Sequence, residues 1–483
     1  MGKILGLRAR WWILLALVLV PLILVGVLVW ELMSSDLQAR YLAKTAAKMT
    51  WKVQSGPSER IRFPQGGPYD QRLGYSKLPD YLERLSARGW EVERQAKISI
   101  QMERAHDLGL NLPYREKNQG GLILLDDGGR PLYQSLHPER VYADFTDTPP
   151  ALRNALLFIE NRELLNEKFP SKNPAVEWDR LGQAVLDKFY SLINPAHNVP
   201  GGSTLPTQIE KYRHSPEGLT QSMTDKLKQM GSASLRAYLD GKNTLPTRQR
   251  IVRDYLNTVP LSAAPRFGEV NGVGDGLWAW YGLDFKKANA ALWRLEKNPG
   301  DAEGAMVFKH ALSLLVAERK PSYYLARDRA ALDRYTNVHL DLLAEAGVIS
   351  RALRDAALKV SLRGPQHRVD PPAPAFVLQK AGNSQRVRLA GLLGESRLYD
   401  LDRLDLTAES TLNGRAQRAV TGFPPGLSNP QQAAALGLYG SRLLLPANDL
   451  SKVIYSFTLY EKSPEGMLLR VQADNLNQPF DIN

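Results

Sequence analysis

The chain has 483 residues, of which 43% are hydrophobic and 23% are charged, and its formal net charge is +12. This length allows about two or three domains, and the composition is that of a folded protein. The absence of cysteine excludes disulfides, thiolate zinc sites and cysteine nucleophiles. A basic chain either carries a solvated basic surface or binds an anionic partner such as nucleic acid, anionic lipid or a diphosphate.

Residues 1–34 predict a cytoplasmic N-terminus followed by a transmembrane anchor. No charged residue occurs from Trp11 to Trp30, and an apolar run of about 20 residues spans a bilayer core as a helix. Lys3, Arg8 and Arg10 precede this run, which predicts that the N-terminus stays inside the cell. A cleaved signal peptide is the alternative, but its apolar core is shorter, about 7–15 residues, and precedes a small-residue cleavage site. With the remaining chain outside the cytoplasm, nucleic acid is excluded as a partner.

Four further regions follow the anchor. A helical periodicity that begins near residue 149 continues to about residue 362. A β-hairpin is predicted at 120–135 around a DDGG turn, and two alternating strands are predicted at 452–461 and 467–473. A proline-rich stretch at 363–376 indicates a domain boundary. We therefore divide the chain into a membrane-proximal region (35–118), a main domain (119–362), a linker (363–430) and a small β-containing tail (431–483).

Glu160 is the first candidate for chemistry. It lies near the end of a predicted helix whose residues Leu152, Leu156 and Ile159 form an apolar stripe. A carboxylate at the edge of an apolar face is suited to accept a proton as a general base. From this segment alone, a solvated glutamate at a helix end is the alternative.

The segment Gly201–Lys211, GGSTLPTQIEK, predicts a site for an anion. Its glycines let backbone approach a ligand closely, and Ser203 or Thr204 caps a helix that begins there. Gln208 and Lys211 are three residues apart and therefore share one face of this helix. Free N–H groups at a helix N-terminus attract phosphate. The alternative is an ordinary capped helix after a flexible loop.

A third helical segment covers residues 247–260. Ile251, Val252, Tyr255 and Leu256 form its core stripe. Arg248 lies one turn before Val252, at the rim of the buried face. Asn257 is expected to end the helix and to bond loop backbone.

In order and spacing, these segments resemble the motifs of family-51 glycosyltransferases. These are the peptidoglycan transglycosylases, found alone or at the front of class A penicillin-binding proteins. The ENR sequence at 160–162 resembles their opening Glu-Asp-Arg/His motif, and GGSTLPTQIEK resembles Gly-Gly-Ser-Thr-x-x-Gln-Gln-x-x-Lys. Residues 248–257, 272–285 and the ERKPSYY segment resemble later motifs. The likeness runs from about 120 to 362, and residues 404–420 resemble the linker that precedes a transpeptidase domain.

The resemblance implies a mainly α, two-lobed, lysozyme-like glycosyltransferase domain behind an N-terminal transmembrane helix, with a small β-containing C-terminal tail. It implies an inverting peptidoglycan glycosyltransferase that polymerises lipid II into glycan strands and releases polyprenyl diphosphate. Glu160 would deprotonate the acceptor 4-hydroxyl. The residues implied to bind substrate and to stabilise the leaving diphosphate are Gly202, Ser203, Thr204, Gln208, Lys211, Lys226, Arg248 and Asn257.

The implied partners are lipid II, the growing glycan strand, the lipid bilayer and other cell-wall or envelope proteins. No cofactor is required and no metal site is predicted, although a divalent cation could accompany the substrate diphosphate. The implied location is the bacterial cytoplasmic (inner) membrane, crossed once, with the catalytic domain on the periplasmic face.

Five positions depart from the family pattern, and two of them are Gln221, in place of a basic residue, and Arg253, in place of a common acidic residue. Asn161 replaces the usual Asp, Asp225 replaces an Arg, and Gln229 replaces the second catalytic Glu. We predict that Gln229 acts as a neutral hydrogen-bonding substitute in the catalytic pair. No Ser-x-x-Lys or Lys-Thr-Gly motif of a transpeptidase is present.

Two alternative functions compete with an active polymerase. One is a catalytically weak or inactive relative that binds lipid-linked glycan or scaffolds an envelope complex. The other is a lysozyme-like enzyme that cleaves glycan with a glutamate as acid, for which a diphosphate site has no use.

Overall fold

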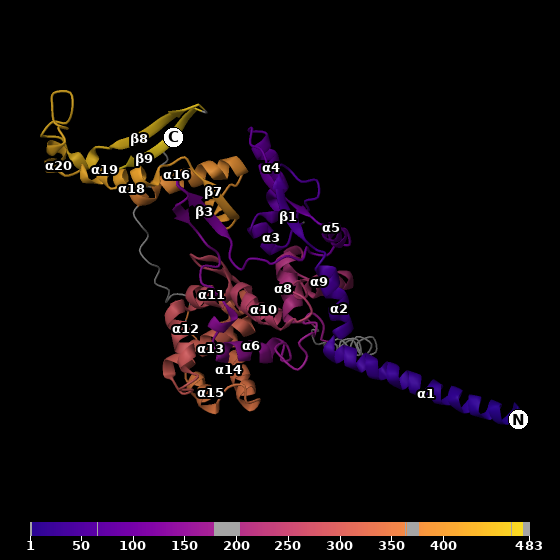
Figure 1. Cartoon of the computed structure of the whole chain (residues 1–483). Helices are drawn as coiled ribbons and strands as arrows, with labels where there is room; N and C mark the ends of the chain where they lie inside the picture. Colours follow the sequence, from indigo (N-terminus) through magenta and orange to yellow (C-terminus); the bar gives the residue numbers. More distant parts are fainter. Residues whose placement is uncertain are drawn as a thin grey trace. The chain divides into compact units, whose positions relative to one another are not determined.

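The computed structural model describes residues 2–64, 66–177, 203–362, 364, 376–464 and 466–476. The chain divides into two compact units, each assembled from three separate segments (Figure 1). Unit 1 comprises Met1–Asp70, Val92–Asn118 and Arg140–Arg368, and unit 2 comprises Gln71–Glu91, Gln119–Glu139 and Val369–Asn483. The units therefore do not follow the contiguous boundaries at 119 and 363 that the sequence suggests.

Two helices begin unit 1. Helix α1 covers Gly2–Ser34, and after Ser35, whose φ is 57°, helix α2 covers Asp36–Ala46. The Glu31 carboxylate accepts the first N–H groups of α2, from Leu37 at 2.8 Å and Gln38 at 2.9 Å. In the described residues no single helix has the length and hydropathy of a membrane span, whereas Leu19–Ser34 and Asp36–Ala46 meet both criteria as a pair bent by 55°. The transmembrane anchor stays a prediction.

Helices form most of the rest of unit 1. More than half of residues 149–362 is helical, which confirms the mainly α character that we predicted there. The helices are α6 (Pro150–Glu160), α8 (Leu205–His214), α9 (Met223–Ala237), α10 (Leu245–Thr258), α11 (Gly272–Tyr281), α12 (Phe285–Arg294), α13 (Ala302–Ala317), α14 (Arg329–Glu345) and α15 (Arg351–Leu358). Shorter elements are η2 (Phe145–Asp147), η3 (Pro216–Gly218), η4 (Ser322–Arg327), and the paired strands β5 (Pro260–Ala264) and β6 (Gly268–Asn271).

Helix α13 lies at the centre of this helical core. Its side chains are buried almost all round, as expected of a helix that is apolar on every face. It packs against α6, α11, α12, α14 and α15. The α11 contact is close, because a Cβ on Gly276 would lie 2.7 Å from side-chain atoms of Leu261 and Leu314. The one lysine of α13, Lys309, is fully buried, donates to the Val360 carbonyl at 2.5 Å and forms an ion pair with Asp333 at 3.0 Å.

The membrane-proximal region also contributes to unit 1. Strands β1 (Trp51–Ser55) and β2 (Arg94–Ile98) pair antiparallel, followed by helix α5 (Ile100–Asp107). Helix α3 covers Pro68–Arg72, where the chain passes from unit 1 to unit 2. Helix α2 packs on α9, where Ala39, Ala46 and Tyr238 form a small cluster. Residues 35–70 and 92–118 are thus part of unit 1, whereas residues 71–91 belong to unit 2, a division that the mixed sequence of this region did not indicate.

A buried network of charges joins the membrane-proximal region to α8. The Glu116 carboxylate accepts bonds from Arg213 at 2.5 Å and from His214 at 2.7 Å, and pairs with Arg236 at 2.7 Å. The second ring nitrogen of His214 lies 2.9 Å from Asp70. Burial disfavours the imidazolium, but the Glu116 and Asp70 carboxylates outweigh it and raise the pKa of His214 to about 10. His214 is therefore a buried cation at neutral pH.

Unit 2 contains a three-stranded sheet of order β4-β3-β7. Strands β3 (Gly121–Leu125) and β4 (Pro131–Gln134) form the hairpin that the sequence predicts. Strand β7 (Asp405–Glu409) pairs parallel with β3 from far along the chain. Leu122 and Leu124 of β3 lie in an apolar cluster with Tyr81, Leu401 and Leu404. The helices of this unit are η1 (Tyr75–Lys77), α4 (Leu78–Ser86), α16 (Phe376–Leu393), α17 (Leu398–Leu401), α18 (Gly414–Thr421), α19 (Phe423–Gly426), α20 (Pro430–Ala435) and η6 (Leu450–Lys452).

The two predicted strands of the tail are confirmed. They are β8 (Ser456–Ser463) and β9 (Gly466–Asp474), which pair antiparallel. Val471 and Ala473 of β9 are buried, and β9 packs on α16 and α18. The tail is therefore part of unit 2.

The buried charge of His214 predicts a pH-dependent stability. Its folded pKa of about 10 exceeds the ordinary value of 6.5, so its contribution is complete below pH 6.5 and is lost as the pH rises towards 10. We expect His214→Gln to lower the free energy of unfolding by about 3–5 kcal/mol at pH 6, because it removes the buried positive charge that Glu116 and Asp70 share. The deficit relative to the parent should shrink at pH 10, as measured by urea unfolding in detergent.

The matched control is His106→Gln, since His106 on α5 is partly exposed and lies 3.8 Å from a single, exposed acid, Asp107. That variant should differ little from the parent at either pH. A deficit for His214→Gln that is equal at pH 6 and pH 10 would contradict the assignment of a charged imidazole.

Candidate active site

Glu160 and Gln208 meet at the junction of three helices. Glu160 is the last residue of α6, and its Oε2 accepts a hydrogen bond from Nε2 of Gln208 on α8 at 2.7 Å. The Gln208 Oε1 accepts in turn from the hydroxyl of Tyr255 on α10 at 3.3 Å. Gln208 and Tyr255 are buried, and Glu160 is partly exposed. The prediction that Glu160 lies close to the Gly201–Lys211 segment is confirmed.

Helix α8 begins with the cap that the sequence predicts. Thr204 is the N-cap, and its N–H donates to Oγ1 of Thr207 at 2.9 Å. The Thr204 hydroxyl donates to the carbonyl of Ala175 at 3.3 Å and is buried, so its partners are within the protein. Ser203, directly before it, is partly buried. Gly202 lies outside the described residues, and the predicted binding roles of all three remain predictions.

Lys211 and Glu318 add charge beside Glu160. Lys211 is partly buried, one turn beyond Gln208 on α8, and interacts electrostatically with Glu318, the residue after α13. Burial raises the pKa of the Glu318 carboxyl; Lys211 opposes this rise and Glu160 adds to it. Our sequence prediction missed Glu318. The signal that could have found it is an acidic residue that directly ends an otherwise apolar helix.

Gln229 does not share the hydrogen bonds of Glu160. It is buried on α9, where its Nε2 donates to the Ser215 hydroxyl at 2.8 Å and lies 3.1 Å from Oγ1 of Thr220. In the part of the chain that the structure describes, both ends of this amide are used by the loop after α8. Its predicted catalytic role remains a prediction, and the observed role is to hold that loop.

Asp225 and Lys226 lie in the first turn of α9. The Ser222 hydroxyl caps this helix and accepts the N–H of Asp225 at 3.1 Å. An acidic residue is favourable in the first turn because it faces the positive end of the helix dipole. This placement explains locally why an acid is tolerated where the family has an arginine. Lys226 is partly buried beside it.

Arg248 has partners other than those predicted. It is buried on α10, and its guanidinium donates to four backbone carbonyls, those of Leu164, Asn166, Phe169 and Pro170, at 3.0–3.2 Å. The guanidinium therefore stabilises the 164–170 loop, and contact with a diphosphate stays a prediction.

Asn257 likewise bonds backbone, as the sequence predicts. Its Oδ1 accepts the N–H of Tyr142 at 2.8 Å and its Nδ2 donates to the Tyr142 carbonyl at 2.9 Å. Helix α10 ends one residue later, at Thr258. A direct role in substrate binding is untested for this side chain.

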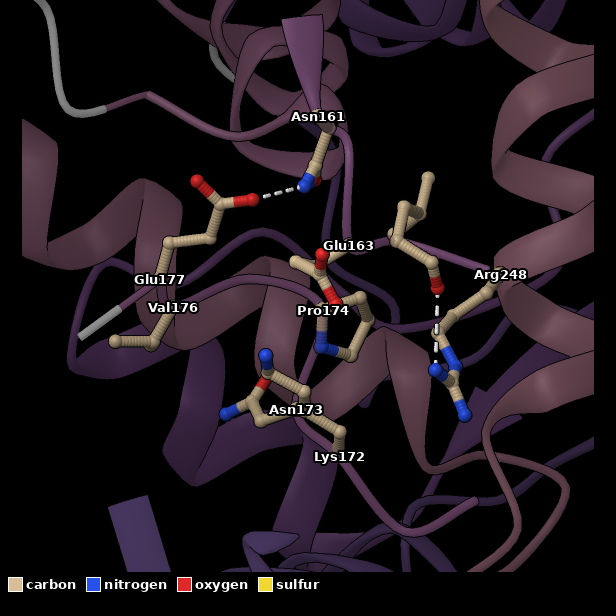
Figure 2. A pocket seen from close by; sticks show the side chains of 9 residues that line it. Asn161, Glu163, Lys172, Asn173, Pro174, Val176, Glu177 and Arg248 are labelled. Carbon is tan, nitrogen blue, oxygen red and sulfur yellow. Dashed lines mark hydrogen bonds between the residues drawn. The ribbon is translucent and has the colours of Figure 1, made fainter. Parts of the chain in front are cut away.

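A small pocket adjoins the residue after Glu160 (Figure 2). Asn161, Lys172, Glu177 and Arg248 are among the residues that line it. The buried Asn161 donates its side-chain N–H to the carboxylate of Glu177. The aspartate usual in the family would place two carboxylates together here, so Glu177 provides a physical reason for the asparagine.

The geometry agrees with a comparison to known families. The family described as Transglycosylase matches residues 129–342, which include Glu160, the capped α8 and all of α10. Residues 129–342 are a transglycosylase domain. This agrees with the resemblance to family-51 glycosyltransferases. No curated protein matches the chain significantly.

In the described part of the chain, no group of three or more His, Asp or Glu side chains is placed to hold a metal ion. A divalent cation that accompanies the substrate diphosphate stays a prediction.

The four carbonyl contacts predict a structural cost for changing Arg248. Arg248→Lys keeps the charge but replaces a planar fork of donors with one point donor. We expect it to lower the free energy of unfolding by about 2–4 kcal/mol, since buried carbonyls lose their donors. Urea unfolding of the full chain in detergent measures this.

Arg250→Lys is the control on the same helix, because Arg250 forms a partly exposed ion pair with Asp240 and should cost about 1 kcal/mol or less. Unchanged stability in Arg248→Lys, together with weakened binding of a diphosphate ligand, would instead favour the role predicted from sequence.

Proposed function

We propose that this protein is a peptidoglycan glycosyltransferase that polymerises lipid II and releases polyprenyl diphosphate. The observation that carries the proposal is the 2.7 Å hydrogen bond between Gln208 and Glu160. It joins the candidate base to the segment whose sequence suits a leaving diphosphate. The match of residues 129–342 to the Transglycosylase family supports the reaction class.

In the proposed reaction, Glu160 accepts the proton of the acceptor 4-hydroxyl. The resulting oxygen attacks the anomeric carbon of the donor on the face opposite the diphosphate, so the configuration inverts. The bond from that carbon to the diphosphate oxygen breaks, and polyprenyl diphosphate leaves with its electron pair. General base catalysis requires a positioned acceptor, and the buried Gln208 amide holds the Glu160 carboxylate through Oε2.

The leaving diphosphate needs positive charge and N–H donors. Lys211 lies on the face of α8 that carries Gln208 and would supply positive charge. In the first turn of this helix, Pro206 has no N–H and the N–H of Thr207 is bound by the Thr204 side chain. We assign Gly202, Ser203 and Lys226 to the same role on the basis of the family resemblance. We propose no resident cofactor, and a divalent cation would enter with the diphosphate as part of the substrate.

We also propose that the domain is anchored at the outer face of the bacterial cytoplasmic membrane. The apolar run up to Trp30 is long enough for an anchor, and the Leu22, Leu24 and Leu28 side chains are 61%, 62% and 56% exposed. Lipid II lies in this membrane, and a net charge of +12 suits anionic lipid and a diphosphate. Other envelope proteins are proposed partners.

One observation favours the alternative of a weak or inactive relative. Gln229 replaces the family's second glutamate, and both ends of its amide are bound to Ser215 and Thr220. A protein that lacks the second acid could bind lipid-linked glycan without turnover.

The proposed base makes a direct prediction. Purified full-length protein in detergent should polymerise lipid II, and Glu160→Gln should lower the rate by about 10²–10⁴-fold, because the amide cannot accept the proton. Gel or chromatographic analysis of labelled glycan strands measures the rate. Glu345→Gln is the control, since Glu345 is exposed at the end of α14 and lies outside the proposed site.

Binding separates the two functions. If the protein is an active enzyme, the parent turns over lipid II and the Lys211→Ala variant binds the donor more weakly. The reason is that Lys211 would face the dianionic diphosphate in a partly dry site. The inactive relative binds lipid II through Lys211 but shows no turnover in the parent. Full activity in Glu160→Gln would show that another group is the base.

The anchor predicts a topology. A reporter that is active only in the cytoplasm should be silent when fused after residue 483, and one that requires the periplasm should be active. Lys3, Arg8 and Arg10 are expected to keep the N-terminus in the cytoplasm. A single crossing of the membrane then places either reporter on the periplasmic side. Strong activity of the cytoplasmic reporter in intact cells would show that the C-terminus lies in the cytoplasm and would contradict the predicted orientation.

A further inference from the structure

The end of helix α1 is fastened to helix α2 by a set of polar contacts. Ser34 and Ser35 are buried at the bend between the two helices, and the φ of Ser35 is 57°, a left-handed conformation that is unfavourable for serine. The Glu31 carboxylate holds the bend by accepting the first N–H groups of α2, and the Trp30 indole N–H donates to Asp36 at 3.3 Å. The end of the apolar run is therefore joined to α2 in a defined geometry.

The same two helices contact the loop formed by residues 164–173. The Trp30 ring lies edge-on to the Phe169 ring, and the ring centroids are 6.1 Å apart. On α2, Oε1 of Gln38 accepts a hydrogen bond from Nδ2 of the buried Asn173 at 3.2 Å. Residues close to the end of the predicted membrane span thus touch both the middle and the end of this loop.

The other side of the 164–173 loop belongs to the Glu160 site. Its first N–H, that of Leu164, donates at 3.1 Å to the carbonyl of Asn161, which directly follows Glu160 in the chain. Arg248 on α10 binds four carbonyls of the loop. The loop also lines the pocket beside Asn161 (Figure 2). One short loop therefore contacts both the end of the predicted anchor and the surroundings of the candidate base.

We propose that the 164–173 loop couples the membrane anchor to the Glu160 site. Trp30, Gln38 and Phe169 are positioning residues in this proposal, since they hold the loop against the end of the anchor and so set the height of the site above the bilayer surface. This rests on the proposed function and on the predicted anchor. The surface of the lipid bilayer then serves as the reference from which the reacting groups are placed.

The physical basis is that a lipid-linked substrate reacts at a height imposed by the membrane. The polyprenyl chain lies in the hydrocarbon, so the diphosphate lies at the level of the headgroups, and the reacting anomeric carbon is bonded to a diphosphate oxygen. A catalytic group displaced by about 1 Å can lose about 10²-fold in rate. Trp30 ends the apolar run, where an aromatic ring favours the membrane interface. Its contact with Phe169 therefore relates the loop, and with it Glu160, to the plane of the headgroups.

A spin label tests the coupling without any activity. The chain has no cysteine, so Glu167→Cys in the full chain accepts a single nitroxide at an exposed position of the loop. In vesicles of phosphatidylcholine and phosphatidylglycerol, this label should collide more with lipid-soluble oxygen, and less with a water-soluble nickel chelate, than a label at Glu345→Cys on the exposed end of α14.

Two further variants in the labelled chain test the anchor contacts. Trp30→Ala and Gln38→Ala should each lower the oxygen contact of the label at residue 167, because the loop is no longer held against the end of the anchor. Tyr41→Ala is the matched control, since it removes a 72% exposed ring from α2 and should leave the label unchanged. A label at residue 167 that is as aqueous as the one at 345, or that neither variant affects, overturns the proposal.

The choice of substrate tests the consequence for the reaction. Trp30→Ala and Phe169→Ala should lower kcat/KM about 10-fold for lipid II in vesicles but about 2-fold or less for a short-chain, water-soluble analogue, because the analogue is not held at the membrane. Phe169→Trp keeps an aromatic ring and should retain most of the parent value, and Tyr41→Ala should leave both values unchanged. Equal losses with the two substrates would show that the loop only supports the fold of the site, and would overturn the proposal.

The outcomes distinguish this inference from the proposed function. An active parent in which Trp30→Ala and Phe169→Ala do not change the ratio of the two kcat/KM values overturns the coupling and leaves the proposed function intact. A parent without turnover on either substrate overturns the proposed function. The label at residue 167 then still decides whether the anchor holds the loop at the bilayer surface.

Discussion

The burial of helix α8 is the constraint on which the arrangement of unit 1 depends. One set of its side chains, Glu210, Arg213 and His214, enters a buried network of charges, and Gln208 holds Glu160. Burying a charge costs several kcal/mol unless its partners are placed correctly, so the helix has little freedom to rotate or slide. The same restriction fixes the Gln208 amide and, through it, the carboxylate of Glu160. The charges of the membrane-proximal region thus position a residue of the site that they do not touch.

Several residues that resemble substrate ligands in the sequence support the walls of the site. Arg248 binds four carbonyls of the 164–170 loop, and Asn257 binds both backbone groups of Tyr142. A general base and an anion site must be held within a fraction of an ångström, which requires such buried polar supports. A motif residue can therefore recur because it fixes a loop, and spacing alone does not separate that role from contact with substrate.

The sequence was most informative where a pattern is local. The apolar stripe ending at Glu160, the cap at Thr204 and the hairpin of β3 and β4 depend on neighbours within a few residues, and each is found. Glu318 and the partners of Glu116 depend on contacts between distant segments. Strand β3 pairs parallel with β7, so that Gly121 lies opposite Asp405. The alternation of apolar residues within a strand does not indicate which distant strand it pairs with. Interleaved units follow from such long-range pairing, so contiguous boundaries could not describe them.

Three of the departures from the family pattern have a local explanation in the structure. Asn161 donates to Glu177, Asp225 lies in the first turn of α9, and Gln229 is held by Ser215 and Thr220. Restoring a family residue singly would place two carboxylates together at 161, or bury a carboxylate with only hydroxyl donors at 229. The substitutions are therefore coupled to their surroundings.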